Sequence, residues 1–225
     1  MPVFLVPAAT QRGQKEKPPA KHCSRERWCI LERMETPARP RLAWGLTGSG
    51  HYLRECLELA REIPDVDLFL TAAAEEVLHM YGHDLAGLRQ GFRVFRDNTA
   101  SAAPVGLFYY GHYHTVVVAP ATSNTVAKCI WGISDTLVSN IFAQAGKCRV
   151  PSIVFACDTA PQMETEAPRE WVTVYPRPID LDNTQRLKAF PLVSVVETLD
   201  ALQAALTARL AEVGPPLTPS RETVR

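Results

Sequence analysis

Short apolar runs alternate along the chain with segments in which apolar residues recur every three or four positions. Three runs have the composition of strands buried in a parallel sheet: Leu42–Leu46, Val66–Leu70 and Thr115–Ala119. Each is followed by a segment with helical spacing: 51–62, 72–81 and 124–144. The alternation continues with strands at 152–156, 172–175 and 193–196 and helices at 183–189 and 198–213. Such alternation implies right-handed crossovers, so it predicts a three-layer α/β/α, Rossmann-like (flavodoxin-like) fold with a doubly wound parallel sheet.

The two ends of the chain lack this alternation. Residues 1–41 carry nine Lys or Arg against four Asp or Glu and no sustained apolar period, which is typical of a disordered tail. Met34, close to the first predicted strand, is an alternative start, and the acidic residues of the tail argue against a mitochondrial presequence. We therefore expect one domain over 42–213, followed by a flexible C-terminal tail over 214–225.

The composition argues against several classes of protein. Lys and Arg together number 24, as do Asp and Glu, so the net charge of zero offers no bulk attraction for nucleic acid. Every apolar run is far shorter than the roughly 20 residues that cross a bilayer. Six cysteines without a CxxC pair, and no secretory signal, predict free thiols, a cytoplasmic location and no zinc or iron–sulfur site. His79 and His83 are four apart on a predicted helix, where we expect a solvated face rather than a metal site.

Polar residues cluster in the loops that follow the three apolar strands. In an open parallel sheet, ligands bind beyond the carboxyl ends of the strands. The segment Thr47–Gly50 contains two glycines before a helix start and suits a phosphate, although a tight strand–helix turn explains it equally well. Thr71 is either a second phosphate ligand or a helix cap. The segment 120–125 holds three hydroxyls and an amide, more than one N-cap needs, so the surplus groups are expected to bind an oxygen-rich ligand.

Two segments of the chain closely resemble motifs of the flavin-dependent cysteine decarboxylase superfamily. Ala119–Thr125 is similar to its PASANT segment, and Gly132–Leu137 to its downstream G-x-x-D-x-L motif. The resemblance extends over about residues 42–202 and implies FMN bound non-covalently at a subunit interface of a homotrimer or an assembly of trimers. The residues that it places at the FMN, with Asp135 in a supporting role, are Gly48, Ser49, Gly50, Thr71, Thr122, Ser123, Asn124, Thr125 and Asp135.

The chain departs from the decarboxylases of this superfamily at two places. Where they carry an active-site histidine, residues 101–106 read SAAPVG, and where they carry a substrate clamp, residues 157–163 read CDTAPQM. Decarboxylation of a cysteine thiol requires a base and a group that holds the carboxylate. The missing residues therefore favour a different reaction.

The chain instead resembles the branch of archaeal flavoproteins and dihydromethanopterin reductases, through Tyr110–Tyr113, Thr122–Lys128 and Ile179–Thr184. This resemblance implies an FMN-dependent oxidoreductase that reduces dihydromethanopterin to tetrahydromethanopterin in one-carbon metabolism, with electrons from a donor protein or reduced nicotinamide. The candidates for protonating the pterin ring are Asp158, Tyr113 and His112. A helix cap for the aspartate and interface packing for the aromatic pair are the alternatives. Two other functions stay open: a phosphopantothenoylcysteine-decarboxylase-like flavoenzyme and a non-enzymatic flavin electron carrier.

Overall fold

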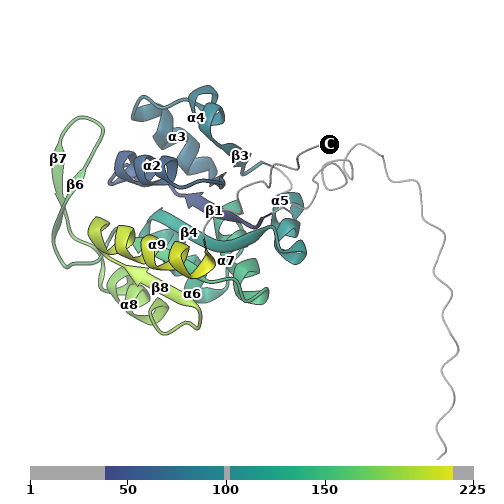
Figure 1. Ribbon diagram of the computed structural model, residues 1–225. Helices are drawn as coiled ribbons and strands as arrows, with labels where there is room; N and C mark the ends of the chain where they lie inside the picture. The colour runs from purple at the N-terminus through teal and green to yellow at the C-terminus, as the bar shows by residue number, and fades with distance from the viewer. Residues whose placement is uncertain (1–38, 99–101, 215–225) are drawn as a thin grey trace, which may run out of the picture. The chain divides into compact units, whose positions relative to one another are not determined.

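The structure, a computed structural model, describes residues 39–98 and 102–214 of the 225-residue chain. Its centre is a six-stranded, all-parallel sheet with the strand order β3-β2-β1-β4-β5-β8 (Figure 1). Its strands are β1 (Arg41–Leu46), β2 (Val66–Leu70), β3 (Arg93–Arg96), β4 (Tyr113–Ala121), β5 (Ser152–Ala156) and β8 (Val193–Val196). The predicted fold class is confirmed, and β3 is an additional strand that the apolar pattern did not predict.

The strand order reverses between β1 and β4. From β1 the chain builds the sheet through β2 to β3, then returns to pair β4 with the other side of β1 and continues through β5 to β8. We call the edge at which β1, β2, β4 and β5 end the carboxyl edge, and the opposite one the amino edge. In sheets of this kind, ligands bind at the carboxyl edge near the reversal.

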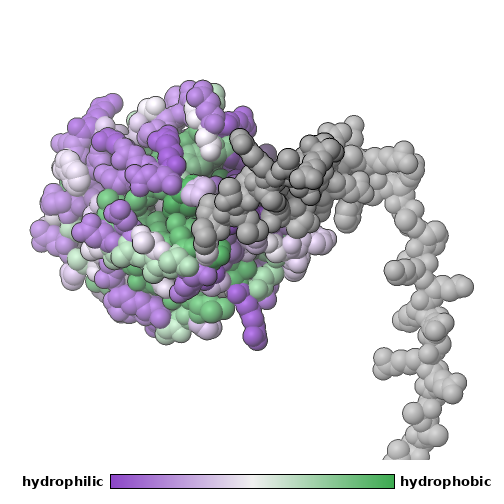
Figure 2. All heavy atoms as spheres, viewed as in Figure 1, coloured by the Kyte–Doolittle hydropathy of each residue, from purple (hydrophilic) through white to green (hydrophobic). Residues whose placement is uncertain are grey.

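Helices cover both faces of the sheet. On one face, α2 (Leu53–Glu62) and α9 (Leu199–Val213) bury leucines against a core that contains Trp44 and Phe155. On the other face lies α7 (Leu137–Lys147). This helix approaches β1 so closely that a Cβ at Gly45 would lie only 2.8 Å from Val138 Cγ1. Figure 2 shows hydrophilic residues over the outer surface and hydrophobic residues deeper, between α2 and α9. The remaining helices are α3 (Ala72–Met80), α4 (Leu85–Gly91), α5 (Ala102–Gly106), the 3₁₀ helix η1 (Leu107–Tyr110), α6 (Ser123–Trp131) and α8 (Pro178–Leu187).

The single helix predicted over 124–144 is wrong, because the structure has two helices there. Gly132 adopts the left-handed conformation (φ 68°) that ends α6. Thr136 and Ser139 then cap the start of α7 reciprocally, each side chain binding the other's backbone N–H. The break turns α7 onto the sheet while α6 packs against α8. The helix predicted at 183–189 begins earlier, with Pro178 in its first turn.

The strand predicted at 172–175 forms outside the main sheet. β7 (Trp171–Val174) pairs antiparallel with β6 (Met163–Glu166), and the two form a hairpin that projects beside the sheet (Figure 1). We call residues 163–174 the hairpin arm. Within the described ranges, no helix combines the length and the apolar character needed to cross a membrane.

Candidate functional site

The three loops predicted to bind a ligand meet at the carboxyl edge and are bonded to one another. The hydroxyl of Thr47 donates to the carbonyl of Pro120 (2.7 Å) and accepts from the backbone N–H of Thr122 (3.1 Å). The backbone N–H of Thr71 donates to the carbonyl of Leu46 (3.2 Å). The loops after β1, β2 and β4 therefore form one polar surface at the reversal of strand order.

The start of α6 combines satisfied and unsatisfied polar groups. Thr122 caps the helix by accepting from the backbone N–H of Thr125 (3.3 Å), and the two hydroxyls lie 3.1 Å apart. The backbone N–H of Ser123 donates to Asp158 Oδ2 (3.2 Å), so this carboxylate already interacts with the positive end of the helix. The side chains of Ser123, half-buried, and Asn124, exposed, have no hydrogen-bond partner within the described ranges. These two side chains are free to bind a ligand.

The glycines after β1 are required by packing within the chain. A Cβ at Gly48 would lie 2.8 Å from the Cβ of Ala73, and one at Gly50 would lie 2.1 Å from the hydroxyl of Tyr81. Helix α3 therefore lies directly against this loop. Thr71 caps the same helix through the backbone N–H of Ala74 (3.0 Å). The packing explains both glycines without a ligand, which supports the tight-turn interpretation and leaves cofactor contact as a proposal.

The hairpin arm also contacts the loop after β1. The hydroxyl of Tyr81 donates to the carbonyl of Glu166 (2.8 Å), and the backbone N–H of Glu166 donates to Nδ1 of His51 (3.3 Å). The ring of Trp171 meets His51 edge-on, with 5.8 Å between centroids, and the ring of Tyr52 is tilted against His51 with 3.8 Å between centroids. His51 and the arm are parts of this site that the sequence patterns missed, because they join it through contacts between residues 85 or more positions apart.

Burial dominates the titration of the groups at this edge. Burial lowers the pKa of His51, and the carboxylates of Glu55, Glu166 and Asp158 oppose that shift. Burial likewise raises the pKa of the Cys157 thiol to about 12, against a hydrogen bond with Ser49. A thiol with that pKa stays protonated at neutral pH, so Cys157 is not a nucleophile here.

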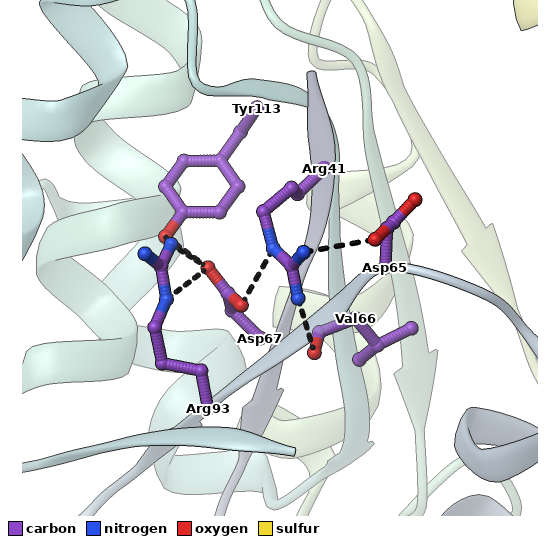
Figure 3. A network of polar contacts seen from close by, with 6 residues as sticks. All are labelled: Arg41, Asp65, Val66, Asp67, Arg93 and Tyr113. Atoms are coloured by element: carbon purple, nitrogen blue, oxygen red, sulfur yellow. Dashed lines mark hydrogen bonds and ion pairs between the residues drawn. The ribbon is translucent and has the colours of Figure 1, made fainter. Parts of the chain in front are cut away.

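Two of the three predicted proton donors lie at the wrong edge of the sheet. Tyr113 is the first residue of β4 and His112 precedes it, so a strand of nine residues separates them from Thr122. At 3.3 Å per residue that distance is roughly 30 Å. The Tyr113 hydroxyl is also engaged, because it donates to the buried carboxylate of Asp67 (2.7 Å; Figure 3). Neither residue reaches a ligand at the carboxyl edge of the same subunit, whereas Asp158 lies at that edge.

Asp135 lies away from the three loops, between α6 and α7. Its side chain is 56% exposed and pairs with Lys128 (2.8 Å). A cavity of about 610 Å³ lies nearby, lined by apolar residues of α6, α7 and the segment before β8. Exposed apolar side chains are found at or near its rim: Trp131, Ile133, Phe190 and Leu192. None of the three predicted loops lines this cavity, so it is separate from the polar site.

The chain is similar in sequence to a protein family and to several individual proteins. The sequence model of a family described as Flavoprotein matches residues 31–214. An uncharacterized protein of Methanocaldococcus jannaschii is 34% identical over 175 residues, covering 74% of this chain and 94% of that protein. A dihydromethanopterin reductase (acceptor) of Methanosarcina mazei is 38% identical over 141 residues, 57% of this chain, and the match spans only 59% of that protein's length.

A solved structure is more similar still in sequence. The crystal structure of Burkholderia xenovorans DmrB in complex with FMN, described as a cubic protein cage for redox transfer, is 58% identical to this chain. It matches with a TM-score of 0.74 over 79% of this chain and 98% of DmrB. The likeness therefore extends through the whole described domain.

Proposed function

Because the chain belongs to the Flavoprotein family, we propose that it binds FMN non-covalently at the carboxyl edge and reduces dihydromethanopterin to tetrahydromethanopterin. The observation that carries the cofactor is the 58% identity with DmrB, which was crystallised with FMN. The observation that carries the substrate is the 38% identity with a reductase of that name. Reduced flavin supplies the hydride chemistry that such a reaction needs.

The polar surface at the carboxyl edge fits the phosphate and ribityl chain of FMN. Ser123 and Asn124 have free side chains. The hydroxyls of Thr122 and Thr125 bond to each other, which leaves one O–H free to donate to a phosphate oxygen and acceptor capacity for the ribityl hydroxyls. Asp158 is an acidic residue, whereas a residue that binds phosphate is expected to be basic. Arg177 lies close enough to Asp158 for the two charges to interact. The residues proposed to hold FMN are Gly48, Ser49, Gly50, Thr71, Thr122, Ser123, Asn124 and Thr125.

The chain's own residues would bind, orient and shield the reactants. Hydroxyl and amide groups after β4 would hold the polar tail, and Trp171 and Tyr52 would limit access of water to the loop after β1. Asp158 is retained as a proton donor, while His112 and Tyr113 are not, because they lie at the amino edge. Asp135, exposed and beyond the far end of α6 from these loops, would contact FMN only from a neighbouring subunit.

We also infer a homo-oligomer built from trimers, with FMN at the subunit interface, and a cytoplasmic location. The exposed apolar side chains around the 610 Å³ cavity support an interface between subunits. The description of DmrB as a cubic cage supports an assembly of many copies. The electron donor is proposed to be a redox protein or reduced nicotinamide.

A single-turnover experiment tests the reaction. The protein is loaded with FMN, reduced anaerobically with dithionite, freed of excess reductant and mixed with dihydromethanopterin. We expect the visible absorbance of oxidised flavin to return in proportion to the tetrahydromethanopterin formed, faster than with reduced free FMN at the same concentration.

The other outcomes identify the rival functions. Flavin that stays reduced with the pterin but exchanges single electrons with ferredoxin would make the protein a carrier and refute the reductase. Release of carbon dioxide from phosphopantothenoylcysteine would make it a decarboxylase. A protein that does not take up FMN at all would refute the whole proposal.

A further inference from the structure

The polar surface at the carboxyl edge carries a negative charge close to where a phosphate is proposed to bind, and this inference rests on that proposed function. Asp158, which follows β5, accepts from the backbone N–H of Ser123 and so lies at the start of α6. A carboxylate there would repel a phosphate monoester, which carries up to two negative charges at neutral pH. A cation is therefore expected beside Asp158, and Arg177 is close enough for the two charges to interact.

Arg177 is the residue before α8 and is fixed against the first turn of that helix. Its Nε donates to Asp180 Oδ2 (2.9 Å) and its Nη2 donates to Asp180 Oδ1 (2.8 Å). The backbone N–H of Arg177 donates to the same carboxylate (2.9 Å). Asp180 is only 5% exposed, whereas the side chain of Arg177 is 67% exposed. Two hydrogen bonds to a buried carboxylate hold the plane of an exposed guanidinium in one orientation.

The pairing with Asp180 uses only part of the hydrogen-bonding capacity of Arg177. Within the described ranges, no hydrogen-bond partner is found for Nη1, and Nη2 has a second N–H. These free donors lie at the end of the guanidinium, which is the part that binds phosphate in a bidentate way. The side chain is therefore oriented by its own chain and still able to bind an anion.

The start of α8 lies near the start of α6. The two helices pack against each other, and Asp158 interacts with both the Ser123 N–H of α6 and the charge of Arg177 before α8 (Figure 1). The N-terminus of a helix carries a partial positive charge. Two such ends and the guanidinium of Arg177 therefore offset the charge of Asp158 in this region.

We propose that Arg177 binds the phosphate of FMN with the N–H groups that Asp180 leaves free. Asp180 is a positioning residue, because it orients the guanidinium without contacting the phosphate. Ser123 and Asn124 supply uncharged donors to the same phosphate, and Arg177 supplies the positive charge that the loops after β1, β2 and β4 lack.

The test compares the affinities of FMN and riboflavin, which differ only in the phosphate. Flavin-free protein is titrated with each flavin and binding is followed by fluorescence. We expect Arg177→Gln to weaken FMN binding by about 30-fold and to change riboflavin binding by less than about twofold. The control is Arg61→Gln, which removes an exposed arginine from the last turn of α2, the end away from the loop after β1. This control should change both affinities by less than about twofold.

Two further variants separate charge from orientation. Arg177→Lys keeps the charge but loses the planar fork, so it should weaken FMN binding by about fivefold. Asp180→Asn should lower the ratio of FMN to riboflavin affinity by a similar factor. Both flavins are measured on the same preparation, so a smaller folded fraction leaves this ratio unchanged.

The protonation state of the bound phosphate gives an independent readout. A nearby cation favours the dianion, so the phosphate of FMN bound to the native chain should take up its proton at a lower pH than in Arg177→Gln. The ³¹P chemical shift of bound FMN, followed against pH at saturating protein, measures this difference.

Four results would overturn the inference. These are unchanged FMN affinity in Arg177→Gln, an equal loss of FMN and riboflavin affinity, the same selective loss in Arg61→Gln, or ³¹P titrations that coincide. Unchanged FMN affinity together with weaker pterin binding would place the anion on the substrate instead. A native chain that binds neither flavin would refute the proposed function itself. A native chain that binds FMN without reducing the pterin would refute only the reductase, because these affinities are measured without the pterin.

Discussion

The two edges of the sheet are both rich in polar groups, but they differ in how those groups are used. At the amino edge, the carboxylate of Asp67, which is 0% exposed, accepts from Arg41 Nε (2.8 Å), from Arg93 and from the Tyr113 hydroxyl (Figure 3). At the carboxyl edge, the side chains of Ser123 and Asn124 and Nε2 of His51 have no partner within the described residues. The polar groups of the amino edge are therefore bonded within the chain, whereas those of the carboxyl edge are able to bind a ligand.

This difference shows that the density of polar groups alone does not identify a site. A buried charge is tolerated only when its hydrogen-bonding capacity is filled, so a filled network such as that of Asp67 is structural. Two atoms at the amino edge depart from this pattern, since Arg39 Nη1 and His112 Nδ1 are buried without a partner within the described residues. Side chains with unused hydrogen-bonding capacity, rather than polarity alone, are therefore the reason for proposing the site at the carboxyl edge.

The largest expected effect comes from breaking the amino-edge network. Asp67→Asn removes the charge shared by Arg41 and Arg93, and we expect it to lower the free energy of unfolding by about 3 kcal/mol, measured by urea denaturation. Asp65→Asn, which removes the 49% exposed partner of Arg41, should cost less than about 1 kcal/mol. Neither change should alter FMN affinity in the folded protein. If Asp67→Asn binds FMN more weakly under conditions in which it is fully folded, the amino edge is not purely structural and the proposed difference between the two edges is contradicted.

A pH dependence of stability should also arise at the amino edge. Burial, with the positive charges of Arg209 and Arg39, lowers the pKa of His114 from 6.5 to about 4. Between those values the unfolded chain binds more protons than the native one, so stability rises with pH through this window and is lost as pH falls toward 4. We expect about 2 kcal/mol between pH 4.5 and 7, and a flatter profile in His114→Asn. If His79→Asn, which changes an exposed histidine, flattens the pH profile of stability equally, the pH dependence does not arise specifically from His114.

At the carboxyl edge, Gly50→Ala should separate the hairpin arm from the loop after β1. The new Cβ would displace the Tyr81 ring and break its hydrogen bond to Glu166, at an expected cost of about 1.5 kcal/mol. The amide of Glu166 should then exchange faster with deuterium. Gly91→Ala, where a Cβ meets nothing within 4 Å, serves as the control and should not destabilise the chain. Unchanged exchange at Glu166 would show that the arm holds its place without Tyr81.

The smallest effect on stability should come from Asn124→Ala. This exposed side chain in the first turn of α6 makes no hydrogen bond to the described residues, so we expect a change in unfolding free energy below about 0.5 kcal/mol. FMN affinity should fall about tenfold, the value of one hydrogen bond to a charged group, by fluorescence titration. Asp200→Ala, at the same position of α9, should leave FMN affinity unchanged. Equal affinities for both variants would remove Asn124 from the proposed site.

Much of the fold follows from local patterns, because its central strands are buried on both faces and therefore consist of continuous apolar runs in the sequence. The runs at Leu42–Leu46 and Val66–Leu70 and the β-branched run before Pro120 each form strands where predicted. The helix break at Gly132 has a local signal too, a glycine followed by a Thr136–Ser139 cap, and a close reading of caps would have found it. The short β3 and β6 lack such runs and were not predicted, and β7 was predicted as a strand but not as part of a separate hairpin.

The sequence by itself determined the fold class and the three polar loops, because the apolar period and the polar surplus at a helix start act over a few residues. It did not show which partners Tyr113 and Asp158 have. Only the tertiary structure decided that the Tyr113 hydroxyl binds the buried carboxylate of Asp67 while Asp158 meets the start of α6. The same holds for His51, whose tautomer is set by the backbone of Glu166, 115 positions away. Contacts between residues so far apart in the sequence depend on how the strands assemble into the sheet and on where the hairpin arm lies. No local pattern in the sequence contains that information.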